Sequence, residues 1–490
     1  MSPLAIRARK LAILTHRWLG VFFCVLFLGW FASGFAMMYF DYPRIHLEDR
    51  LRRNGSIAAD RVRLSLEEAT AKVRSRPDHA RLNMLLDRPV YRFHRGPLQD
   101  VVFADTGGAL VSVSEADGRK IAARWTGLPA RQATFEGFLT EEDQWTLNRT
   151  VRPLRPFLKY SWPAGDEVYV SSVTGEVMQH TTRASRMGAY AGAIPHWIYF
   201  TILRKETGLW RIVVIWLSAI GTAMTIFGLI AGFWLYSPSK RYRYDGEPSA
   251  IPYAGQKRWH TFFGLVFGLV TFTWILSGMM SMNPFQWESS VGAAAKSLQG
   301  GEWRAGTFDP SALNRLGLDA KEVTFTMFAG QPLTRALESP AKSMLLSPAS
   351  QPRPRLDFEE MDKAIRSAFP STREVRLVKE YEVYYVDRHN RKPLPSVFGD
   401  LGDSEHTTIY LDPSSGQIAQ SYSGMARWNR WLYHGLHSLD LPFLYHNRPL
   451  WDVVVLFLMA GGTALSVTGV VIGIRRARQK LSQRALVRAA

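Results

Sequence analysis

The sequence predicts an integral membrane protein: a bundle of four transmembrane helices, built from tandem duplicated halves, with two large extracytoplasmic α+β domains. Three observations lead to this fold class. Apolar residues are gathered into four long runs although the mean hydropathy of the chain is near neutral. Basic residues concentrate at the ends of those runs, and the second half of the chain repeats features of the first. Such apolar blocks between polar stretches are typical of membrane proteins with water-exposed parts.

Four segments are long and apolar enough to cross a hydrocarbon core of about 30 Å, which takes about 20 helical residues. They are Trp18 to Phe40, Ile212 to Tyr236, Phe262 to Met282 and Val453 to Ile474. We interpret the first as an uncleaved span, because its apolar stretch exceeds that of an ordinary signal peptide and no clean A-x-A cleavage site follows.

The formal net charge of +18 is concentrated in three short stretches. Residues 1–17, 237–259 and 475–490 together hold 15 basic and 2 acidic residues, which supplies +13 of that charge. Bases at the ends of apolar runs mark the cytoplasmic side of a membrane. We therefore place both termini and the loop 237–259 in the cytoplasm, and we expect membrane lipid rather than nucleic acid as the partner of these charges.

The predicted organisation follows from the spans and their direction. It comprises a cytoplasmic N-terminus with the first span (1–40), an outer domain (41–210), the second span (211–236), a cytoplasmic loop (237–259), the third span (260–283), a second outer domain (284–450), the fourth span (451–474) and a basic cytoplasmic tail (475–490). The only cysteine, Cys24, lies within a span, so no intrachain disulfide can form.

The chain repeats itself. At an offset of 244 residues the stretch HRWLG at 16–20 aligns with HTFFG at 260–264. At an offset of 241 a longer block aligns without gaps, and its matched pairs include Tyr169 with Tyr410, His196 with His437, Trp210 with Trp451, and Gly228 with Gly469. Parallel repeats of this kind imply an axis along the membrane normal.

The outer segments are predicted to be small α+β units. Residues 65–73 and 357–365 have apolar side chains at helical spacing and acids in the first turn, where the helix dipole favours them. The predicted strands are Val90 to Phe93, Asp100 to Ala104, Glu167 to Ser171, Glu374 to Val378, Glu382 to Asp387 and Thr407 to Leu411. Several are joined by turns that contain glycine.

These features together resemble the PepSY-associated transmembrane helix family. The resemblance rests on the H-x-W-x-G start of a span, on a helix followed by strands and a D-x-x-T/S-G hairpin, and on a Leu-His segment before the returning span. It covers nearly the whole chain and is most specific at 16–34, 260–278 and 406–473. It is weakest at about 284–355, which we interpret as an insertion in the second PepSY-like domain. In the first-half hairpin, Ser171 stands where the second half has Asp412.

Some members of that family are similar to bacterial inner-membrane ferric-siderophore reductases, which hold two b-type haems among their spans. Others are known only by their PepSY module, which is associated with peptidase inhibition or signalling. The resemblance therefore implies a bacterial inner-membrane protein, and it leaves open an iron-uptake oxidoreductase and a non-enzymatic sensor or accessory protein that regulates a periplasmic partner.

Four histidines are the predicted cofactor ligands, because an ionisable side chain near membrane depth is a functional candidate and haem iron accepts neutral imidazole. His16 and His260 occupy equivalent cytoplasmic ends of spans and are expected to face each other across one haem. His196 and His437 precede equivalent spans at the outer side and are expected to hold a second haem. His434 lies three residues before His437 and remains an alternative ligand or a second-shell partner.

Other metal-binding residue types are interpreted as structural. His94, His389, His406 and His446 fall in outer loops or strands, where a histidine is more often a solvated surface residue than a ligand. The methionines at the outer ends of the first and third spans could bind copper or haem iron, but flexible packing is the preferred interpretation.

Several common sites are absent from the sequence. There is no phosphate-binding P-loop, no dinucleotide fingerprint and no C-x-x-C-H motif for covalent haem. A haem protein of this kind would therefore take electrons from a separate donor, quinol or a cytoplasmic reductase, and pass them outward to a ferric siderophore or another ferric chelate. No side chain is predicted to act as a general acid or base.

Overall fold

The structure of the protein is a computed structural model that describes residues 3–285, 291–347, 350–387 and 389–489. The chain divides into two compact units. The helix unit comprises Met1–Tyr42, Met187–Trp287 and Arg427–Ala490, and the sheet unit comprises Pro43–Arg186 and Glu288–Ala426. Both halves of the chain therefore contribute to each unit.

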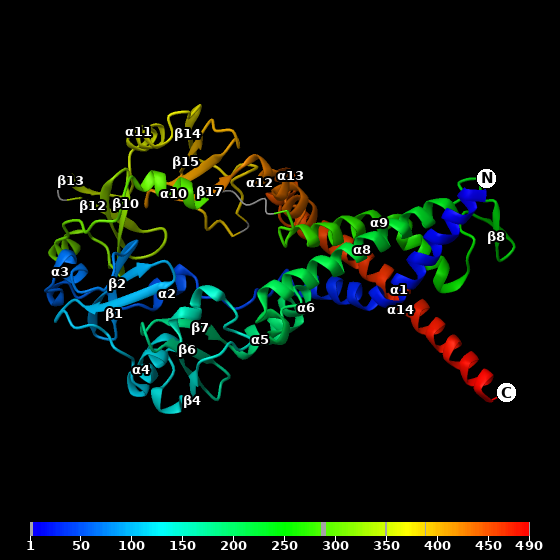
Figure 1. The fold of residues 1–490 in the computed structure, drawn as a ribbon, viewed down its shortest axis with the longest axis horizontal. Helices are drawn as coiled ribbons and strands as arrows, with labels where there is room; N and C mark the ends of the chain where they lie inside the picture. Colours follow the sequence, from blue (N-terminus) through cyan, green and yellow to red (C-terminus); the bar gives the residue numbers. More distant parts are fainter. Residues whose placement is uncertain (1–2, 286–290, 348–349, 388, 490) are drawn as a thin grey trace. The chain divides into compact units, whose positions relative to one another are not determined.

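Four long helices form the helix unit: α1 (Pro3–Met37), α8 (Thr207–Leu235), α9 (Gly255–Met280) and α14 (Leu450–Ala489) (Figure 1). Helices α1 and α9 each pack against both α8 and α14, which closes the four into a bundle. All four are long and apolar enough to cross a membrane. Each predicted run lies within or overlaps one of them, and α1 and α14 continue well past the apolar sequence because basic residues outside the hydrocarbon can remain helical.

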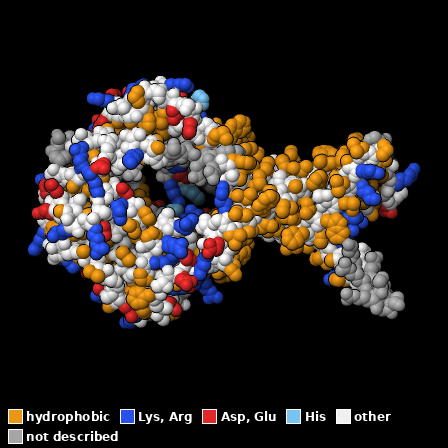
Figure 2. All heavy atoms as spheres, in the orientation of Figure 1, with side chains coloured by type: hydrophobic (Ala, Val, Ile, Leu, Met, Phe, Trp, Pro, Cys, Tyr) orange, Lys and Arg blue, Asp and Glu red, His pale blue; other side chains and the backbone are white. Residues whose placement is uncertain are grey.

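The bundle is apolar on its outside. Phe22, Trp216 and Phe457 are largely exposed, whereas Ser33 and Ser277 are buried between helices. Figure 2 shows hydrophobic side chains over most of the visible surface of the bundle, with lysine and arginine at the end that carries the N-terminus and the hairpin of β8 (Tyr242–Tyr244) and β9 (Glu247–Ser249). This surface suits lipid, with the basic end in water.

Short helices precede α8 and α14. Those before α8 are α5 (Arg183–Ala191), α6 (Ala193–His196) and α7 (Thr201–Arg204), and those before α14 are α12 (Gly424–Asn429), the π-helical turn η5 (Arg430–Gly435) and α13 (Pro442–Tyr445). Helix α6 packs on α1, and η5 packs on α9. These contacts bring two histidine-bearing segments against the spans.

The sheet unit contains two four-stranded antiparallel meanders, each packed against a helix. The first consists of β4 (Thr134–Leu139), β5 (Phe157–Ser161), β6 (Glu167–Ser171) and β7 (Val177–Thr181) under α4 (Glu115–Thr126), and the second of β14 (Glu374–Val378), β15 (Ser396–Asp400), β16 (Thr408–Asp412) and β17 (Gln417–Tyr422) near α11 (Phe358–Ala368). Trp125 and Tyr160 belong to the first core, and Met361 and Ile409 to the second.

A seven-stranded sheet joins the two halves of the chain, in the order β13-β12-β11-β10-β1-β2-β3. Its strands are β1 (His79–Leu85), β2 (Arg88–Arg95), β3 (Leu98–Phe103), β10 (Glu322–Phe328), β11 (Gln331–Leu337), β12 (Ser343–Ser347) and β13 (Ser350–Arg353). Strands β1 and β10 pair antiparallel, with Ala80 opposite Phe325 and Leu82 opposite Val323. Much of the segment that we interpreted as an insertion is therefore sheet.

The remaining elements of the sheet unit are short. They are α2 (Leu47–Arg53), η1 (Ala59–Arg61), α3 (Leu66–Thr70), η2 (Ala130–Gln132), η3 (Arg149–Leu154), α10 (Val291–Gln299) and η4 (Pro310–Arg315). Residues 286–290 and 348–349 of the interpreted insertion, and the last residue of the basic tail, lie outside the described residues.

One predicted strand is wrong. Residues 382–387 form no strand, and Glu382 and Tyr385 make only an isolated bridge within a turn. Their alternation has another cause: the Tyr385 ring is buried and stacks on Tyr410 at a centroid distance of 4.5 Å, and its hydroxyl donates a hydrogen bond to the Pro393 carbonyl. The predicted helix at 65–73 is confirmed only over the five residues of α3.

Candidate functional site: two histidine pairs

The four predicted histidines lie in the helix unit, in two layers. In the inner layer, formed by His16 on α1 and His260 on α9, the ring centroids are 6.1 Å apart. In the outer layer, formed by His196 at the end of α6 and His437 just after η5, the ring centroids are 5.9 Å apart. Each layer therefore joins one histidine from each half of the chain.

Main-chain carbonyl groups orient both rings of the inner layer. Nδ1 of His16 lies 3.0 Å from the carbonyl oxygen of Met224, and Nδ1 of His260 lies 3.3 Å from that of Leu465 and 3.1 Å from the Thr468 hydroxyl. Because a carbonyl oxygen can only accept, Nδ1 carries the proton and Nε2 carries the lone pair. None of the described residues forms a hydrogen bond with either Nε2.

Main-chain carbonyl groups also orient the rings of the outer layer, and here they belong to α1 and α9 instead of α8 and α14. Each Nδ1 contacts a tryptophan carbonyl oxygen and a serine hydroxyl one helical turn away. The distances are 3.1 Å from His196 to both Trp30 and Ser33, and 3.3 and 3.0 Å from His437 to Trp274 and Ser277. Carbonyl partners again leave Nε2 as the nitrogen with an available lone pair.

The hydrogen-bond partners of the histidines are also repeated in the two halves of the chain, at the same offsets of 241 and 244 residues. Met224 and Leu465 are 241 residues apart, and 244 residues separate the two tryptophans and the two serines of the outer layer. One contact is not repeated, because Phe227 occupies the position equivalent to Thr468. The two layers therefore repeat in detail, with one extra hydroxyl on His260.

A glycine faces each of the four rings. A Cβ atom would lie 2.6 Å from Cε1 of His16 at Gly228, 3.5 Å from that of His260 at Gly469, and 3.9 Å from those of His196 and His437 at Gly34 and Gly278. Non-bonded carbon atoms pack well at about 3.5–4.0 Å. Only Gly228 is therefore required by the space that its histidine occupies.

The inner histidines line a cavity of about 310 Å³ within the bundle. This volume is at the lower end of the ~300–1,000 Å³ of small-molecule pockets. Glycines account for much of the wall: Gly20, Gly228, Gly232, Gly264, Gly268, Gly469 and Gly473. Arg17, Lys257 and Arg476 also line it, so the cavity combines flat apolar walls with positive charge.

Among the buried donors of the helix unit that lack a hydrogen-bond partner among the described residues, three belong to residues that line the inner cavity or hold the outer histidines. They are Nε of Arg476, which lines the inner cavity, and Nε1 of both Trp30 and Trp274, whose carbonyl groups hold the outer histidines. Buried polar groups are nearly always hydrogen-bonded in folded proteins. These donors therefore fit a bound molecule that brings acceptors such as carboxylates.

The alternative candidates are placed differently. The ring that lies beside His196 is that of His437, whereas the His434 ring packs beside Tyr433 at a centroid distance of 4.5 Å. Met38 packs against the apolar cluster around Trp451.

Among the other histidines, His94 is not a solvated surface residue, because its ring stacks on that of His79 and accepts a hydrogen bond from Arg81. It belongs to the sheet unit, whereas the four predicted ligands belong to the helix unit.

Among the described residues no group of three or more histidine, cysteine or acidic side chains is placed to hold a metal ion. The pairs thus differ from structural zinc sites, which use four protein ligands. The sequence alone identified the four histidines through their repetition. It did not identify the carbonyl partners, although the repeated spacing of Trp30 with Ser33 and Trp274 with Ser277 could have suggested the serines.

A comparison with known families gives a match over most of the chain. The family model described as the PepSY-associated TM region matches residues 13–370. No curated protein matches the sequence.

Proposed function

Since the chain belongs to the PepSY-associated transmembrane family, and since its helix unit carries two matched histidine pairs, we propose that it is a bacterial inner-membrane electron-transfer protein. In this proposal each pair holds one b-type haem, and the protein reduces a ferric siderophore or another ferric chelate at the periplasmic face. The matched contacts of the two halves support a tandem duplication, and the two helix-and-meander units of the outer segments support two PepSY-like domains.

The separation of the rings carries the proposal. Imidazole nitrogen binds a metal ion such as zinc at about 2.0–2.1 Å, so two imidazoles on opposite sides of one ion have ring centroids roughly 6 Å apart. The centroid distances here are 6.1 and 5.9 Å. Both layers therefore have the spacing of two imidazole ligands that share one central atom.

The surroundings of the rings support haem as the shared group. The Nδ1 contacts fix the tautomer that leaves Nε2 free for iron, and such contacts also raise the basicity of a ligating imidazole. The glycine walls of the inner cavity leave room for a flat molecule, and Arg17, Lys257 and Arg476 would meet its carboxylates. In the outer layer, the indole nitrogens of Trp30 and Trp274 are donors for the same groups.

Haem held by two histidines would supply a one-electron centre. The residues of the chain would then set its surroundings: the imidazoles would bind the iron, the carbonyl groups would orient the imidazoles, and the apolar helices would exclude water. Ser33 of α1 contacts His196 of the outer layer, and it follows His16 of the inner layer by 17 residues. This separation corresponds to roughly 25 Å of helix. The two layers thus lie toward opposite ends of a hydrocarbon core of about 30 Å.

The charges orient the two layers in this proposal. The basic end of the bundle is assigned to the cytoplasm, so the inner layer would receive electrons from quinol or a cytoplasmic reductase. The outer layer would deliver them to the chelate. Hard oxygen donors prefer Fe(III) to the softer Fe(II), so reduction would weaken the hold of the chelator on iron.

Absorption spectroscopy tests this function. Protein purified in detergent from cells supplied with haem should show a Soret band, and sharp α and β bands after reduction with dithionite. Alanine at His16, His260, His196 or His437 should each remove about one haem of two. The double variant His16→Ala/His260→Ala should lose no more than either single variant, whereas His16→Ala/His196→Ala should lose both haems.

Two further variants decide between the alternatives. His406→Ala, in the sheet unit, is the control and should keep both haems. If His434→Ala removes the outer haem and His437→Ala does not, His434 is the ligand. A colourless protein would exclude the haem proposal and leave the second reading of the family, a non-enzymatic sensor or accessory protein.

A further inference from the structure

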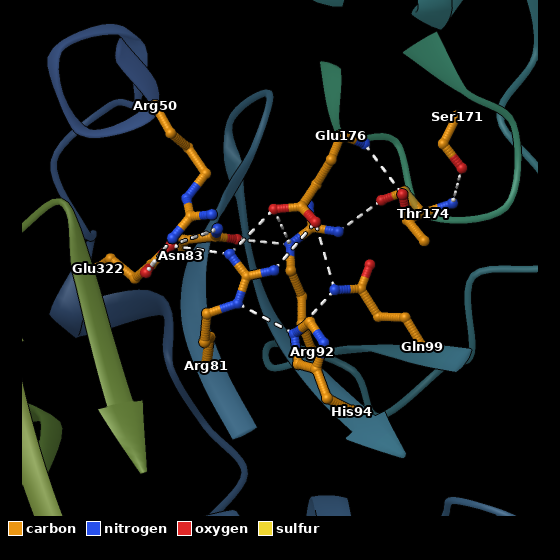
Figure 3. A network of polar contacts seen from close by, with 10 residues as sticks. All are labelled: Arg50, Arg81, Asn83, Arg92, His94, Gln99, Ser171, Thr174, Glu176 and Glu322. Atoms are coloured by element: carbon orange, nitrogen blue, oxygen red, sulfur yellow. Dashed lines mark hydrogen bonds and ion pairs between the residues drawn. The ribbon is translucent and has the colours of Figure 1, made fainter. Parts of the chain in front are cut away.

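A buried ion network crosses the sheet unit (Figure 3). Glu322, at the start of β10, is fully buried and accepts hydrogen bonds from Arg50 on α2 at 2.8 Å and from Arg81 on β1 at 3.1 Å. Glu176, after β6, pairs with Arg81 at 3.0 Å and with Arg92 at 3.7 Å. Three guanidinium groups thus share two carboxylates.

A pocket of about 220 Å³ adjoins this network. Arg50, Arg92 and Glu176 of the network line it, together with Arg53 at the end of α2 and Arg124 on α4. The volume is below the ~300–1,000 Å³ of pockets for drug-sized ligands. A ligand enclosed here would therefore be small and would meet four arginines and one carboxylate.

Arg53 is the arginine of this pocket without a carboxylate partner among the described residues. Its guanidinium donates to the Trp125 carbonyl oxygen and lies 5.1 Å from the centroid of the Trp125 ring. Burial lowers the pKa of Arg53, and burial lowers the pKa of Arg92 to about 10. Both shifts have the direction expected where burial and neighbouring arginines outweigh the attraction of nearby carboxylates.

Four buried donors around the pocket lack a hydrogen-bond partner among the described residues. They are Nε of Arg50, Nε of Arg53, Nδ2 of Asn54 and Nε1 of Trp125, and all four residues line the pocket. The Trp125 side chain is 7% exposed, so water reaches it little. Unpartnered buried donors are costly, and a carboxylate or phosphate group offers acceptors only.

From these observations we propose that the pocket is a binding site for a small oxyanion, a carboxylate or phosphate group. Arg53 supplies the uncompensated charge, and Arg50, Asn54 and Trp125 supply further hydrogen-bond donors. The site belongs to the sheet unit and does not depend on haem in the helix unit.

Titration calorimetry on the full-length protein in detergent tests the site, with citrate and inorganic phosphate as separate probes. Arg53→Gln should weaken binding by at least about tenfold, because hydrogen bonds to charged groups contribute most. Trp125→Phe keeps the ring and removes the indole donor, and it should weaken binding several-fold. Arg52→Gln is the matched control: Arg52 pairs with Asp49 and does not line the pocket, so this variant should change binding much less than Arg53→Gln does.

Each outcome has a defined meaning. Binding of citrate alone assigns a carboxylate ligand, binding of phosphate alone assigns a phosphate ligand, and either result requires the loss in Arg53→Gln. The proposal is overturned if neither anion binds at about 10 mM, tenfold above a dissociation constant of about 1 mM, or if Arg53→Gln and Arg52→Gln bind alike. Should Arg53→Gln fail to fold by circular dichroism, Trp125→Phe decides.

Discussion

Each histidine of the two layers is held by a main-chain carbonyl, which substitution of the partner side chain does not remove. Met224 and Leu465 can therefore vary without changing the tautomer of His16 or His260. Gly228 is different, because a Cβ atom there would lie where the His16 ring lies, whereas a Cβ at the glycines that face the other three rings would be at ordinary contact distance from those rings. Gly228 is therefore the position that the inner pair requires most strictly.

Replacing Gly228 with alanine should remove the inner haem and keep the outer one. The added Cβ would lie 2.6 Å from Cε1 of His16 and would displace the ring from its ligand position. Alanine raises helix stability by about 0.8–1.0 kcal/mol relative to glycine, so a loss of haem would not come from a weaker helix. The ratio of haem to protein, measured on the pyridine adduct, gives the result.

Gly29→Ala is the matched control for that change. Gly29 lies on α1, the helix that carries His16, but it is exposed, it does not line the cavity, and nothing lies within 4 Å of a Cβ built there. It should keep both haems. Equal haem content in the two variants would contradict the role assigned to Gly228.

At the scale of elements, β1 and β2 hold a pair of uncharged imidazoles. His79 and His94 are cross-strand partners whose rings stack at a centroid distance of 4.3 Å. Nε2 of His94 accepts a hydrogen bond from Nε of Arg81 at 3.0 Å, which requires a neutral ring. Burial, with the charge of Arg81, lowers the pKa of His94 to about 2, and burial also lowers the pKa of His79.

The stability of this strand pair should therefore decrease as the pH is lowered. In the unfolded chain both rings bind a proton below about pH 6.5, whereas in the folded chain they stay neutral to lower pH. Their contribution is complete above pH 6.5 and is lost as the pH falls toward the folded pKa, by at most about 1.4 kcal/mol per pH unit for each ring. Hydrogen exchange of β1 and β2 at pH 7.5 and 5.5, corrected for intrinsic rates, measures the loss.

His94→Gln should remove about half of that pH dependence. His389→Gln, at an exposed position, should leave it unchanged. If His94→Gln shows the full pH dependence, the stacked rings are not its source.

The sequence predicts those strands and helices whose residues follow a local pattern of apolar spacing and turns. Strands at 374–378 and 167–171 are confirmed with their predicted bounds, because alternation and glycine turns specify them. The strand at 382–387 is wrong because aromatic packing of Tyr385 on Tyr410 produces a similar alternation. Helix α4 was not predicted, although Ser114 caps it and Gly127 ends it in the left-handed conformation.

The candidate site was also predicted only in part. Repetition in the sequence was enough to pair His16 with His260 and His196 with His437, and the rings are adjacent in the structure. The contacts of Nδ1 could not be predicted, because they involve carbonyl groups that every residue has. The oxyanion pocket brings Arg53 and Glu176 together from distant positions, and no local pattern connects them.

At the scale of the whole molecule, the assigned orientation puts the β8–β9 hairpin in the cytoplasm and the sheet unit in the periplasm. Cys24 is the only cysteine, so Cys24→Ser gives a background without thiols. In spheroplasts, a membrane-impermeant maleimide should label Asp60→Cys and should not label Asp245→Cys until the cells are lysed. Both positions are exposed in the structure. The reverse labelling would contradict the orientation.

The pairing of β1 with β10 bears on how the protein is made. Strand β1 is synthesised long before residues 322–328 leave the ribosome, since two candidate spans lie between them in the chain. During that interval one edge of β1 has no native partner, and open strand edges pair readily with other chains. Neither half, expressed alone, can complete this sheet. The two halves, although each has two spans of its own, must therefore mature as one polypeptide or be produced together.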